Sequence, residues 1–595
     1  MTFQTVLVAN RGEIADRVFR TCVELGIATV GIYVAGDTAH LDLADQVREV
    51  PTYLDSAAIV TAALETGAEA IHPGYGFLSE NAQFAKAVTD AGLVFVGPTA
   101  EVIELMGRKD RAREVAERAG VPVTPRFEPD AVPADAYPVL VKAAAGGGGK
   151  GMHIVTESAG LASALATAAR EAKSAFGDDT LLIEKYVEGG RHVEVQVFGD
   201  HHSNVVHLLD RDCSVQRRHQ KVVEEAPAPN LSASVRDRIR TAAVDLCREV
   251  GYQNAGTVEY LVRGDEAYFL EMNTRLQVEH PVTEEVTGTD LVAWQLAVAA
   301  GDPLPLTQEQ IPADGHAIEV RVYAEDPYSG FLPQTGQVVD LWWPAEARIE
   351  SVLASGAEVS AAFDPMLAKI ITAADDRAEA IAAMLTALDS AAIFGPKTNL
   401  GFLRRVVGSA TFGEARMDTG WLDSSPTEVL SEPTVPPVAI AAAAAVLWPI
   451  ADDAWRSAGP AAPIVRPVVD EQGERYDVTE PSWDYAPIFA GGPRVWVGAE
   501  GQSWLFERPD GTRRPRVIHL GDAEVVSPMP GTVIAVDVAV GDLVEAGARL
   551  GAVEAMKMEL ALTAPHCGLV TQVEAQVGSQ VKLGDLLFHV EAQEA

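Results

Sequence analysis

Apolar and polar positions in the first part of the chain follow the pattern of strands that alternate with amphipathic helices. Residues 5–34 contain an apolar run, a turn, a segment with helical period and a second apolar run, which is typical of the βαβ start of an α/β domain. The stretch lacks the G-x-G-x-x-G sequence of a dinucleotide site, so it does not indicate a nicotinamide cofactor.

Acidic side chains interrupt two apolar strands further along. Glu259 lies in the middle of 256-GTVEYLV-262, while Glu271 and Asn273 in 267-AYFLEMN-273 face the same side of their strand. Two carboxylates and an amide oxygen are ligands suited to Mg²⁺. A regular hairpin with residues 263–266 as its loop would pair Glu259 with Leu270 and place the two glutamates on opposite faces. A shared metal site therefore requires an odd loop or a β-bulge.

A glycine run follows the apolar strand 138–144. The sequence 146-GGGGKGM-152 exposes backbone N–H groups that suit triphosphate oxygens, and Lys142 can add a positive charge. The Gly-Lys-Ser/Thr ending of a P-loop is absent. A flexible linker is the alternative, which the flanking strands and the lysine disfavour. The loop 72-HPGYGFLSEN-81 is weak evidence for a site when taken alone.

The C-terminal segment is an internal duplication. Residues 528–555 are repeated at 565–592 with a constant offset of 37, so that Gly531 corresponds to Gly568. Both halves have short β-branched runs separated by glycine turns, which predicts two small sheets in a flattened sandwich. Lys557 lies in the join between the halves, flanked by Met556 and Met558. We expect it at an exposed hairpin tip where an enzyme can modify it; an ordinary surface lysine is the alternative.

Residues 425–520 separate this duplication from the rest of the chain. A Pro/Ser/Thr-rich junction at 424–438 precedes the apolar run 438–448, which is too short to span a bilayer and indicates a buried helix. Residues 476–489 and 494–520 predict short strands with turns, including a hairpin around Gly498–Gly501. A small subunit-docking domain and a structured linker are equally good interpretations of this region.

Charge and cysteine usage narrow the function classes. The 595 residues carry a formal charge of −39, which argues against binding to nucleic acid or anionic membranes. No signal peptide is evident and four scattered cysteines form neither a disulfide nor a zinc pattern, so we expect a reduced cytoplasmic protein. The segment 210–229 nevertheless gathers Arg217, Arg218, His219 and Lys221, which predicts a local site for an anionic substrate; a salt-bridged surface is the alternative. Cys213 is expected to be a packed thiol.

Three sequences together carry a specific resemblance: RDCSVQRRHQK at 211–221, EMNTRLQVEHPVTE at 271–284, and the glycine run. With them, residues 1–424 resemble a biotin carboxylase, and Ala555-Met556-Lys557-Met558 resembles the AMKM signature of biotin carboxyl carrier domains. The chain thus resembles the α-subunit of an acetyl-, propionyl- or 3-methylcrotonyl-type acyl-CoA carboxylase. Ala144-Ala145, where many relatives have Ser-Gly, is a small departure.

The resemblance implies a multidomain α/β fold with an ATP-grasp domain, followed by an all-β sandwich. The implied domains are a Rossmann-like N-terminal domain (1–113), the ATP-grasp domain (114–318), the C-terminal carboxylase domain (319–424), the linker or docking region (425–520) and the biotinyl carrier domain (521–595).

The resemblance also implies roles for individual residues. Lys557 would carry covalent biotin, and Glu259, Glu271 and Asn273 would bind Mg²⁺ or Mn²⁺. Lys221, Arg275, Gln277 and Val278 would bind bicarbonate, Glu279 would be the general base, and Arg321 would stabilise the biotin enolate. The implied ATP-binding residues are Lys109, Lys142, Gly148, Gly149, Glu184, Lys185, Val187, His192, Gln216 and His219.

No part of the chain remains for a carboxyltransferase, so the resemblance implies a separate carboxyltransferase β-subunit, a biotin protein ligase as modifying enzyme, and a homodimer of the carboxylase part. The acyl-CoA acceptor is not encoded here. Two other functions stay open at this point: an ATP-grasp carboxylate–amine ligase with a lipoyl-like carrier, and a catalytically inactive carrier or scaffold. Competent side chains at the ATP, metal and base positions disfavour the inactive scaffold.

Overall fold

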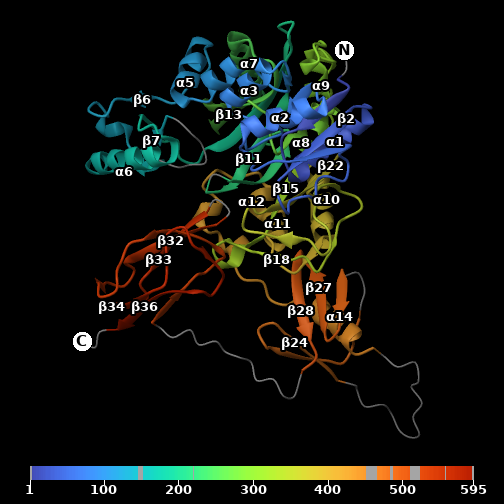
Figure 1. Cartoon of the computed structure of the whole chain (residues 1–595), viewed down its shortest axis with the longest axis vertical. Helices are drawn as coiled ribbons and strands as arrows, with labels where there is room; N and C mark the ends of the chain where they lie inside the picture. Colours follow the sequence, from blue (N-terminus) through green and yellow to red (C-terminus); the bar gives the residue numbers. More distant parts are fainter. Residues whose placement is uncertain are drawn as a thin grey trace.

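The computed structural model describes residues 3–144, 152–218, 220–449, 465–482, 487–509, 523–555 and 558–592. Four of the expected site residues, Gly148, Gly149, His219 and Lys557, lie outside this set. Figure 1 shows a large body formed by the first part of the chain, with two smaller β-rich units below it.

The N-terminal unit is a five-stranded sheet with the order β3-β2-β1-β4-β5. Strand β1 pairs in parallel with β2 and β4, which confirms the expected βαβ start. Its elements are β1 (Thr5–Val8), α1 (Gly12–Glu24), β2 (Ala28–Tyr33), β3 (Gln46–Glu49), α2 (Ser56–Thr66), β4 (Ala70–His72), α3 (Ala82–Asp90), β5 (Val94–Phe95) and α4 (Ala100–Met106).

A four-stranded sheet, β6-β9-β7-β8, forms a lobe with helix α6, and this lobe projects from the body in Figure 1. Buried apolar residues of these strands pack on the helix, so the lobe has a small core of its own. Its elements, with the preceding helix α5 (Lys109–Arg118), are β6 (Arg126–Phe127), β7 (Val139–Ala143), β8 (His153–Val155), α6 (Ser158–Phe176) and β9 (Leu181–Lys185).

The centre of the body is an eight-stranded sheet with the order β14-β13-β10-β11-β12-β15-β22-β20. It continues without a break across the expected domain boundary at 318/319, because β12 pairs with β15. Its strands and covering helices are β10 (Arg191–Gly199), β11 (Val205–Arg217), β12 (Gln220–Ala226), α7 (Ala233–Val250), β13 (Asn254–Arg263), β14 (Glu266–Asn273), α8 (His280–Thr287), α9 (Leu291–Ala299), β15 (His316–Tyr323), β20 (Arg348–Glu350) and β22 (Met366–Ala374).

Short strands and helices complete the body around one apolar core that includes Val320, Ile370 and Phe402. These elements are β16 (Glu325–Asp326), β17 (Leu332–Pro333), β18 (Gly336–Gln337), β19 (Asp340–Trp342), β21 (Glu358–Val359), α10 (Arg377–Ser390), β23 (Ala392–Phe394), α11 (Leu400–Val407), α12 (Ala410–Gly413) and α13 (Thr427–Leu430).

The region between body and carrier contains the expected apolar helix, α14 (Pro437–Leu447), packed on a five-stranded sheet. The expected hairpin is also present, as β27 pairs with β28. This sheet contacts the body: Trp496 stacks on Phe394 with ring centroids 6.1 Å apart, and Gln502 Nε2 donates to Tyr328 Oη at 2.7 Å. The strands are β24 (Arg466–Asp470), β25 (Arg475–Val478), β26 (Ile488–Gly491), β27 (Arg494–Ala499) and β28 (Gln502–Glu507).

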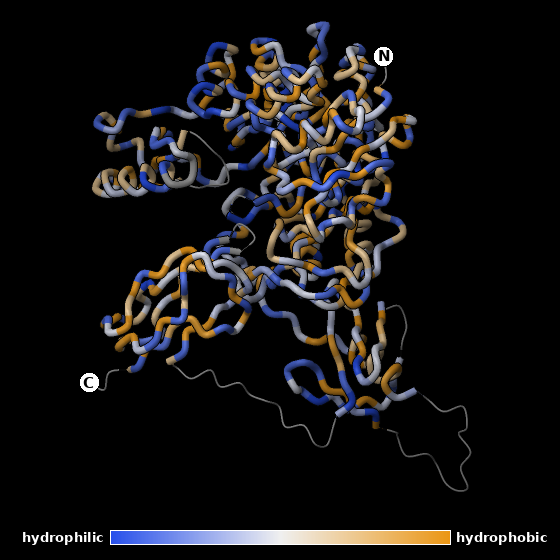
Figure 2. Tube along the Cα trace, in the orientation of Figure 1, coloured by the Kyte–Doolittle hydropathy of each residue, from blue (hydrophilic) through white to orange (hydrophobic). Residues whose placement is uncertain are grey.

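The C-terminal unit consists of two four-stranded sheets, β29-β36-β34-β31 and β33-β32-β30-β35, around a shared apolar core. This confirms the flattened sandwich. Apolar and polar segments alternate along its strands in Figure 2, as expected for strands with one buried face. The strands are β29 (Glu524–Val526), β30 (Gly531–Val536), β31 (Leu543–Val544), β32 (Arg549–Ala555), β33 (Met558–Thr563), β34 (Gly568–Val573), β35 (Gln580–Val581) and β36 (Leu586–Ala592).

Among the described residues, no helix combines the length and apolar character needed to cross a membrane.

Candidate active site

A cavity of about 1120 Å³ lies between the N-terminal unit, the α6 lobe and the central sheet. Most of the expected site residues line it, although they are up to 212 positions apart in the sequence, as Lys109 and Arg321 are. The residues brought together are Lys109, Lys142, Glu184, Lys185, Val187, His192, Gln216, Lys221, Glu259, Glu271, Asn273, Arg275, Gln277, Val278 and Arg321.

The hairpin of β13 and β14 resolves the pairing question raised by its two glutamates. Near its turn the register is regular, with Arg263 opposite Glu266. The register then shifts beside Tyr260, so that Glu259 lies opposite Glu271 instead of opposite Leu270. The bulge required for a shared carboxylate site is therefore present.

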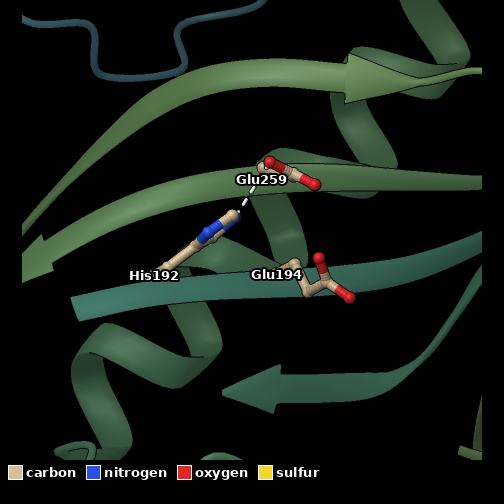
Figure 3. A group of neighbouring side chains, drawn as sticks. All are labelled: His192, Glu194 and Glu259. Atoms are coloured by element: carbon tan, nitrogen blue, oxygen red, sulfur yellow. Dashed lines mark ion pairs between the residues drawn. The ribbon is translucent and has the colours of Figure 1, made fainter. Parts of the chain in front are cut away.

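Figure 3 shows His192, Glu194 and Glu259 on neighbouring strands, with the ion pair between His192 and Glu259 marked. The distance from His192 Nε2 to Glu259 Oε2 is 2.8 Å. Burial lowers the pKa of His192, but the charge of Glu259 outweighs it, so the net shift is upward. Burial likewise raises the pKa of Glu259, and the cationic side chains of Lys221 and His192 more than reverse this. The imidazolium and the carboxylate thus favour each other's charged form.

Lys221 is the centre of the charged network. Its Nζ lies 2.6 Å from Glu194 Oε2, 3.1 Å from Glu259 Oε1 and 2.6 Å from Glu279 Oε1. Burial lowers the pKa of Lys221, but the surrounding acidic groups raise it well above its usual range. The ammonium is therefore a permanent positive charge that holds three carboxylates around one point.

Glu279 does not line the cavity. It is fully buried and lies between Lys221 and Arg321, which do line the cavity. The Nη2 atom of Arg321 is 2.9 Å from Glu279 Oε2. Burial raises the pKa of Glu279, but Lys221, Arg321 and Arg211 together hold it well below its usual range. Glu279 is therefore ionised, as an acceptor of protons must be, and its basicity is reduced by the same cations.

A second glutamate, Glu224, also contacts Arg321, with 2.5 Å between Glu224 Oε1 and Nη2. The pKa of Glu224 is raised to about 7, mainly by burial. Arg321 thus lies between two buried carboxyl groups, which fix the position of its guanidinium at the cavity wall.

The ATP-side lysines are also ion-paired. Lys142 Nζ lies 2.8 Å from Glu184 Oε2, and Lys109 Nζ lies 3.0 Å from Glu271 Oε2. Burial raises the pKa of Glu184, but Lys142 and its hydrogen-bond partners lower it overall. Lys185 lines the cavity, and its Nζ donates to the backbone oxygen of Ala136 at 2.8 Å.

The expected cationic cluster at 217–221 is divided. Lys221 reaches the cavity wall, whereas Arg217 turns away: its guanidinium carbon lies 3.8 Å from the ring centroid of Phe331 and its Nη2 donates to Gly330 O at 3.0 Å. The prediction that all members form one anion site is wrong for Arg217, because the apolar ring and a carbonyl take up its side chain.

Cys213 is buried, with a pKa raised well above the usual range mainly by burial, which agrees with a packed thiol.

Sequence reasoning missed several residues of the site. Glu80, from the loop considered weak evidence, pairs with Arg275 (2.9 Å between Oε2 and Nε). Glu194 contacts Lys221, and Arg211 supports Glu194 from behind with a 2.6 Å ion pair. Lys369 donates to the backbone oxygen of Val278 at 2.8 Å. For Glu194, Arg211 and Lys369 the only sequence signal is a charged residue within an apolar strand, which is weak without knowledge of the neighbouring strand.

The residues expected to bind a divalent metal fit that role. Glu259, Glu271 and Asn273 face one cavity, and Asn273 Nδ2 lies 2.7 Å from Glu259 Oε1. They offer hard oxygen ligands of the kind that Mg²⁺ prefers. Both carboxylates are paired with ammonium groups, Lys221 and Lys109, so a metal ion would share these carboxylates with the two lysines.

Comparison with protein families gives four matches along the chain. Residues 2–103 match the biotin carboxylase N-terminal domain, 108–307 the carbamoyl-phosphate synthase L chain ATP-binding domain, and 319–424 the biotin carboxylase C-terminal domain. Residues 523–590 match the family described as biotin-requiring enzyme.

Several curated proteins are similar. Biotin carboxylase of Halalkalibacterium halodurans is 49% identical over 69% of this chain and 96% of its own length. The mouse mitochondrial propionyl-CoA carboxylase α chain is 38% identical over 99% of this chain and 92% of its length. The soybean methylcrotonoyl-CoA carboxylase α-subunit is 47% identical over 71% of this chain and 60% of its length. The matched segment thus spans about three fifths of the methylcrotonoyl-CoA carboxylase relatives.

Solved structures agree with these matches. The biotin carboxylase domain of Hydrogenobacter thermophilus 2-oxoglutarate carboxylase, in complex with MgADP, ADP and bicarbonate, gives a TM-score of 0.70 at 43% identity and covers 73% of this chain and all of that one. The Campylobacter jejuni biotin carboxylase–β-γ-ATP complex gives 0.68 at 42% identity over 71% of this chain and 99% of its own. With both carboxylase and carrier regions matched, the chain belongs to the biotin carboxylase family, in the form that is fused to a biotin carrier domain.

Proposed function

We propose that this chain catalyses the ATP- and bicarbonate-dependent carboxylation of biotin attached to its own Lys557, and supplies the carboxyl group to a separate carboxyltransferase β-subunit. One observation carries the proposal: Lys221 joins Glu259, on the ATP and metal side of the cavity, to Glu279, on the side of Arg321. A single buried ammonium thus links the place where phosphate would be transferred to the place where biotin would react.

On the ATP side, Lys109 and Lys142 would contact the phosphates, with Gly148, Gly149 and His219 adding to the nucleotide site. The chain has a net charge of −39, so local cations are needed to hold a triphosphate. Magnesium on Glu259, Glu271 and Asn273 would supply further charge neutralisation for the phosphoryl group. The ion pairs of both lysines with glutamates keep the ammonium groups in place before ATP arrives.

Bicarbonate would bind Arg275, Gln277, the backbone at Val278 and Lys221. The planar guanidinium of Arg275 matches a planar two-oxygen anion, and Glu80 and Gln277 already orient it. Glu279 would accept the bicarbonate proton while a bicarbonate oxygen attacks the γ-phosphorus of ATP. ADP leaves, and the mixed anhydride then releases phosphate and CO₂. Because the pKa of Glu279 is low, Glu279 is a weak base. Bicarbonate must therefore be bound to Lys221 and Arg275, whose positive charges would lower its pKa and allow the proton to transfer.

Arg321 would donate to the ureido oxygen of biotin, where negative charge accumulates when N1′ gives its proton to the released phosphate and attacks CO₂. Its two carboxylate neighbours hold the guanidinium in position before the reaction, which is the arrangement that makes such a donor effective. The glycine run at 146–152 would close over the nucleotide and exclude water from the unstable anhydride.

We further propose that the chain works in the cytoplasm, receives biotin from a biotin protein ligase, and dimerises through the carboxylase part. The domain boundaries 1–113, 114–318, 319–424, 425–520 and 521–595 are proposed with it; the family matches support them. The multi-subunit relatives support a separate carboxyltransferase. Which acyl-CoA that partner carboxylates is best settled by purifying the native complex and assaying acetyl-, propionyl- and 3-methylcrotonyl-CoA.

The direct test of the proposed chemistry is ADP release by the purified chain in the presence of free biotin. We expect release that requires bicarbonate and Mg²⁺ and that rises when free biotin is added. Glu279→Gln, which keeps the size of the side chain but not its basicity, should lower this rate by roughly 10²–10⁴-fold. Bicarbonate-independent ADP release at full rate in Glu279→Gln would contradict the proposal.

A further inference from the structure

The carboxylase body and the carrier domain touch at Leu332. This residue lies in strand β17 of the body, is only partly buried, and packs against the apolar core of the carrier. The described carrier strands pair only with one another. The contact therefore consists of side chains without any shared strand pairing, which suits a surface that must form and separate.

The residues next to Leu332 are held by a hairpin that also reaches the active-site cavity. Phe331 stacks on Arg217, which also donates to Gly330 O. Arg217 is the last residue of β11, and the following strand β12 begins at Gln220, beside Lys221. Residues 330–333, which we name the carrier ledge, are thus held by the same hairpin that brings Gln220 and Lys221 to the cavity.

The carrier domain is acidic as a whole, and exposed cations lie beside the ledge. Residues 523–592 contain nine acidic side chains but only three lysines and arginines, and biotin attachment would remove the positive charge of Lys557. Exposed cations lie near the ledge on the body: Arg218 follows Arg217, and Lys397 is 63% exposed and pairs with Asp326. Opposite charge speeds the encounter of two surfaces and sets their relative orientation.

We propose that the carrier ledge is the surface on which the carrier domain docks while its biotin is being carboxylated. The proposal rests on the proposed function and adds the surface that positions the carrier. Docking at the ledge would orient the hairpin of β32 and β33 relative to the cavity and raise the effective concentration of tethered biotin there. Free biotin does not use the ledge.

The test compares tethered with free biotin in the full-length biotinylated chain. Leu332→Asp places a carboxylate against the apolar core residues of the carrier, a domain that is itself acidic. Leu64→Asp, at a 54% exposed leucine of α2, is the matched control. We expect Leu332→Asp to slow single-turnover carboxylation of the carrier by about five- to tenfold, which is the size expected for partial burial of one leucine. ADP release stimulated by free biotin should stay within about twofold of wild type. Leu332→Met should behave as wild type.

Unchanged carboxylation of the carrier in Leu332→Asp would overturn the proposal. So would an equal loss of both activities, because the residue would then support the carboxylase fold itself. Failure of the proposed carboxylase function would look different from failure of the docking proposal, because the wild-type chain itself would then lack bicarbonate-dependent ADP release with free biotin.

Discussion

At the residue scale, the chemistry depends on charges that are buried together. Lys221 contacts Glu194, Glu259 and Glu279, and Arg321 contacts Glu224 and Glu279. Each cation lowers the cost of burying the carboxylates beside it, and removing one partner leaves the others uncompensated. Substitutions at this network should therefore change protonation as well as binding.

Arg321→Ala tests the role of the arginine. We expect carboxylation of biotin to fall by roughly 10²–10³-fold, as for loss of an oxyanion donor, while bicarbonate-dependent ATP cleavage stays measurable. Arg321 is one of the cations that lower the pKa of Glu279, so the acidic limb of the ATP-cleavage pH profile should move to higher pH. Both rates are measured on one preparation across pH, with Arg321→Lys as the charge-conserving control. Equal loss of both activities would count against the assignment.

Glu13 provides a prediction for stability. It lines the cavity, and burial raises its pKa to about 7, with Lys369 3.5 Å away opposing the shift. Between the ordinary glutamate pKa of 4.5 and about 7 the native state binds a proton that the unfolded state has lost, so the free energy of unfolding should fall as pH rises through this window. Glu13→Gln should flatten that slope and gain up to about 3 kcal/mol at pH 8. Thermal unfolding midpoints from pH 4.5 to 8 measure the effect; an unchanged slope would refute the explanation.

The site residues show where sequence reasoning succeeds. Lys142, Glu259, Glu271 and Asn273 could be expected at the site from their strands or from the adjoining glycine run. Glu194, Arg211 and Glu224 could not be singled out, since their importance comes from cross-strand neighbours that the sequence does not specify.

At the element scale, two features are decisive: the bulge in β14, and the attachment of the five-stranded sheet β24–β28 to the carboxylase body. The spacing of Glu259 and Glu271 in the sequence already showed that a shared metal site requires a bulge or an odd loop. The attachment was not: residues 425–520 are equally consistent with a linker from sequence alone, because the contacts of Trp496 and Gln502 are with distant segments.

Gly401→Ala tests that attachment. A Cβ at this position would lie 2.0 Å from Gln502 Nε2 and 2.3 Å from its Cδ, so the side chain of Gln502 must move and lose its bond to Tyr328. We expect faster hydrogen exchange in β27 and β28 and about 1–3 kcal/mol lower stability of this unit. The double variant Gly401→Ala/Gln502→Ala should recover part of the protection, since it restores the space. Unchanged exchange in the single variant would show that the close approach does not hold the sheet.

At the scale of the whole molecule, the fold places one nucleotide cavity and one carrier on the same chain. The glycine run and the carboxylase-like motifs predicted the nucleotide site, and the internal duplication predicted the two sheets of the carrier. The way the eight-stranded sheet runs through both the ATP-grasp and the C-terminal carboxylase domains was not predictable, because the pairing of β12 with β15 joins segments about 90 residues apart.

The most direct measurement is mass spectrometry of the purified biotinylated chain after incubation with MgATP and isotope-labelled bicarbonate, without a carboxyltransferase. The account predicts labelled carboxyl groups on the peptide that contains biotinylated Lys557, dependent on ATP and lost in Glu279→Gln. Active native protein with an unmodified Lys557, or a biotinylated peptide that gains no label, would contradict it.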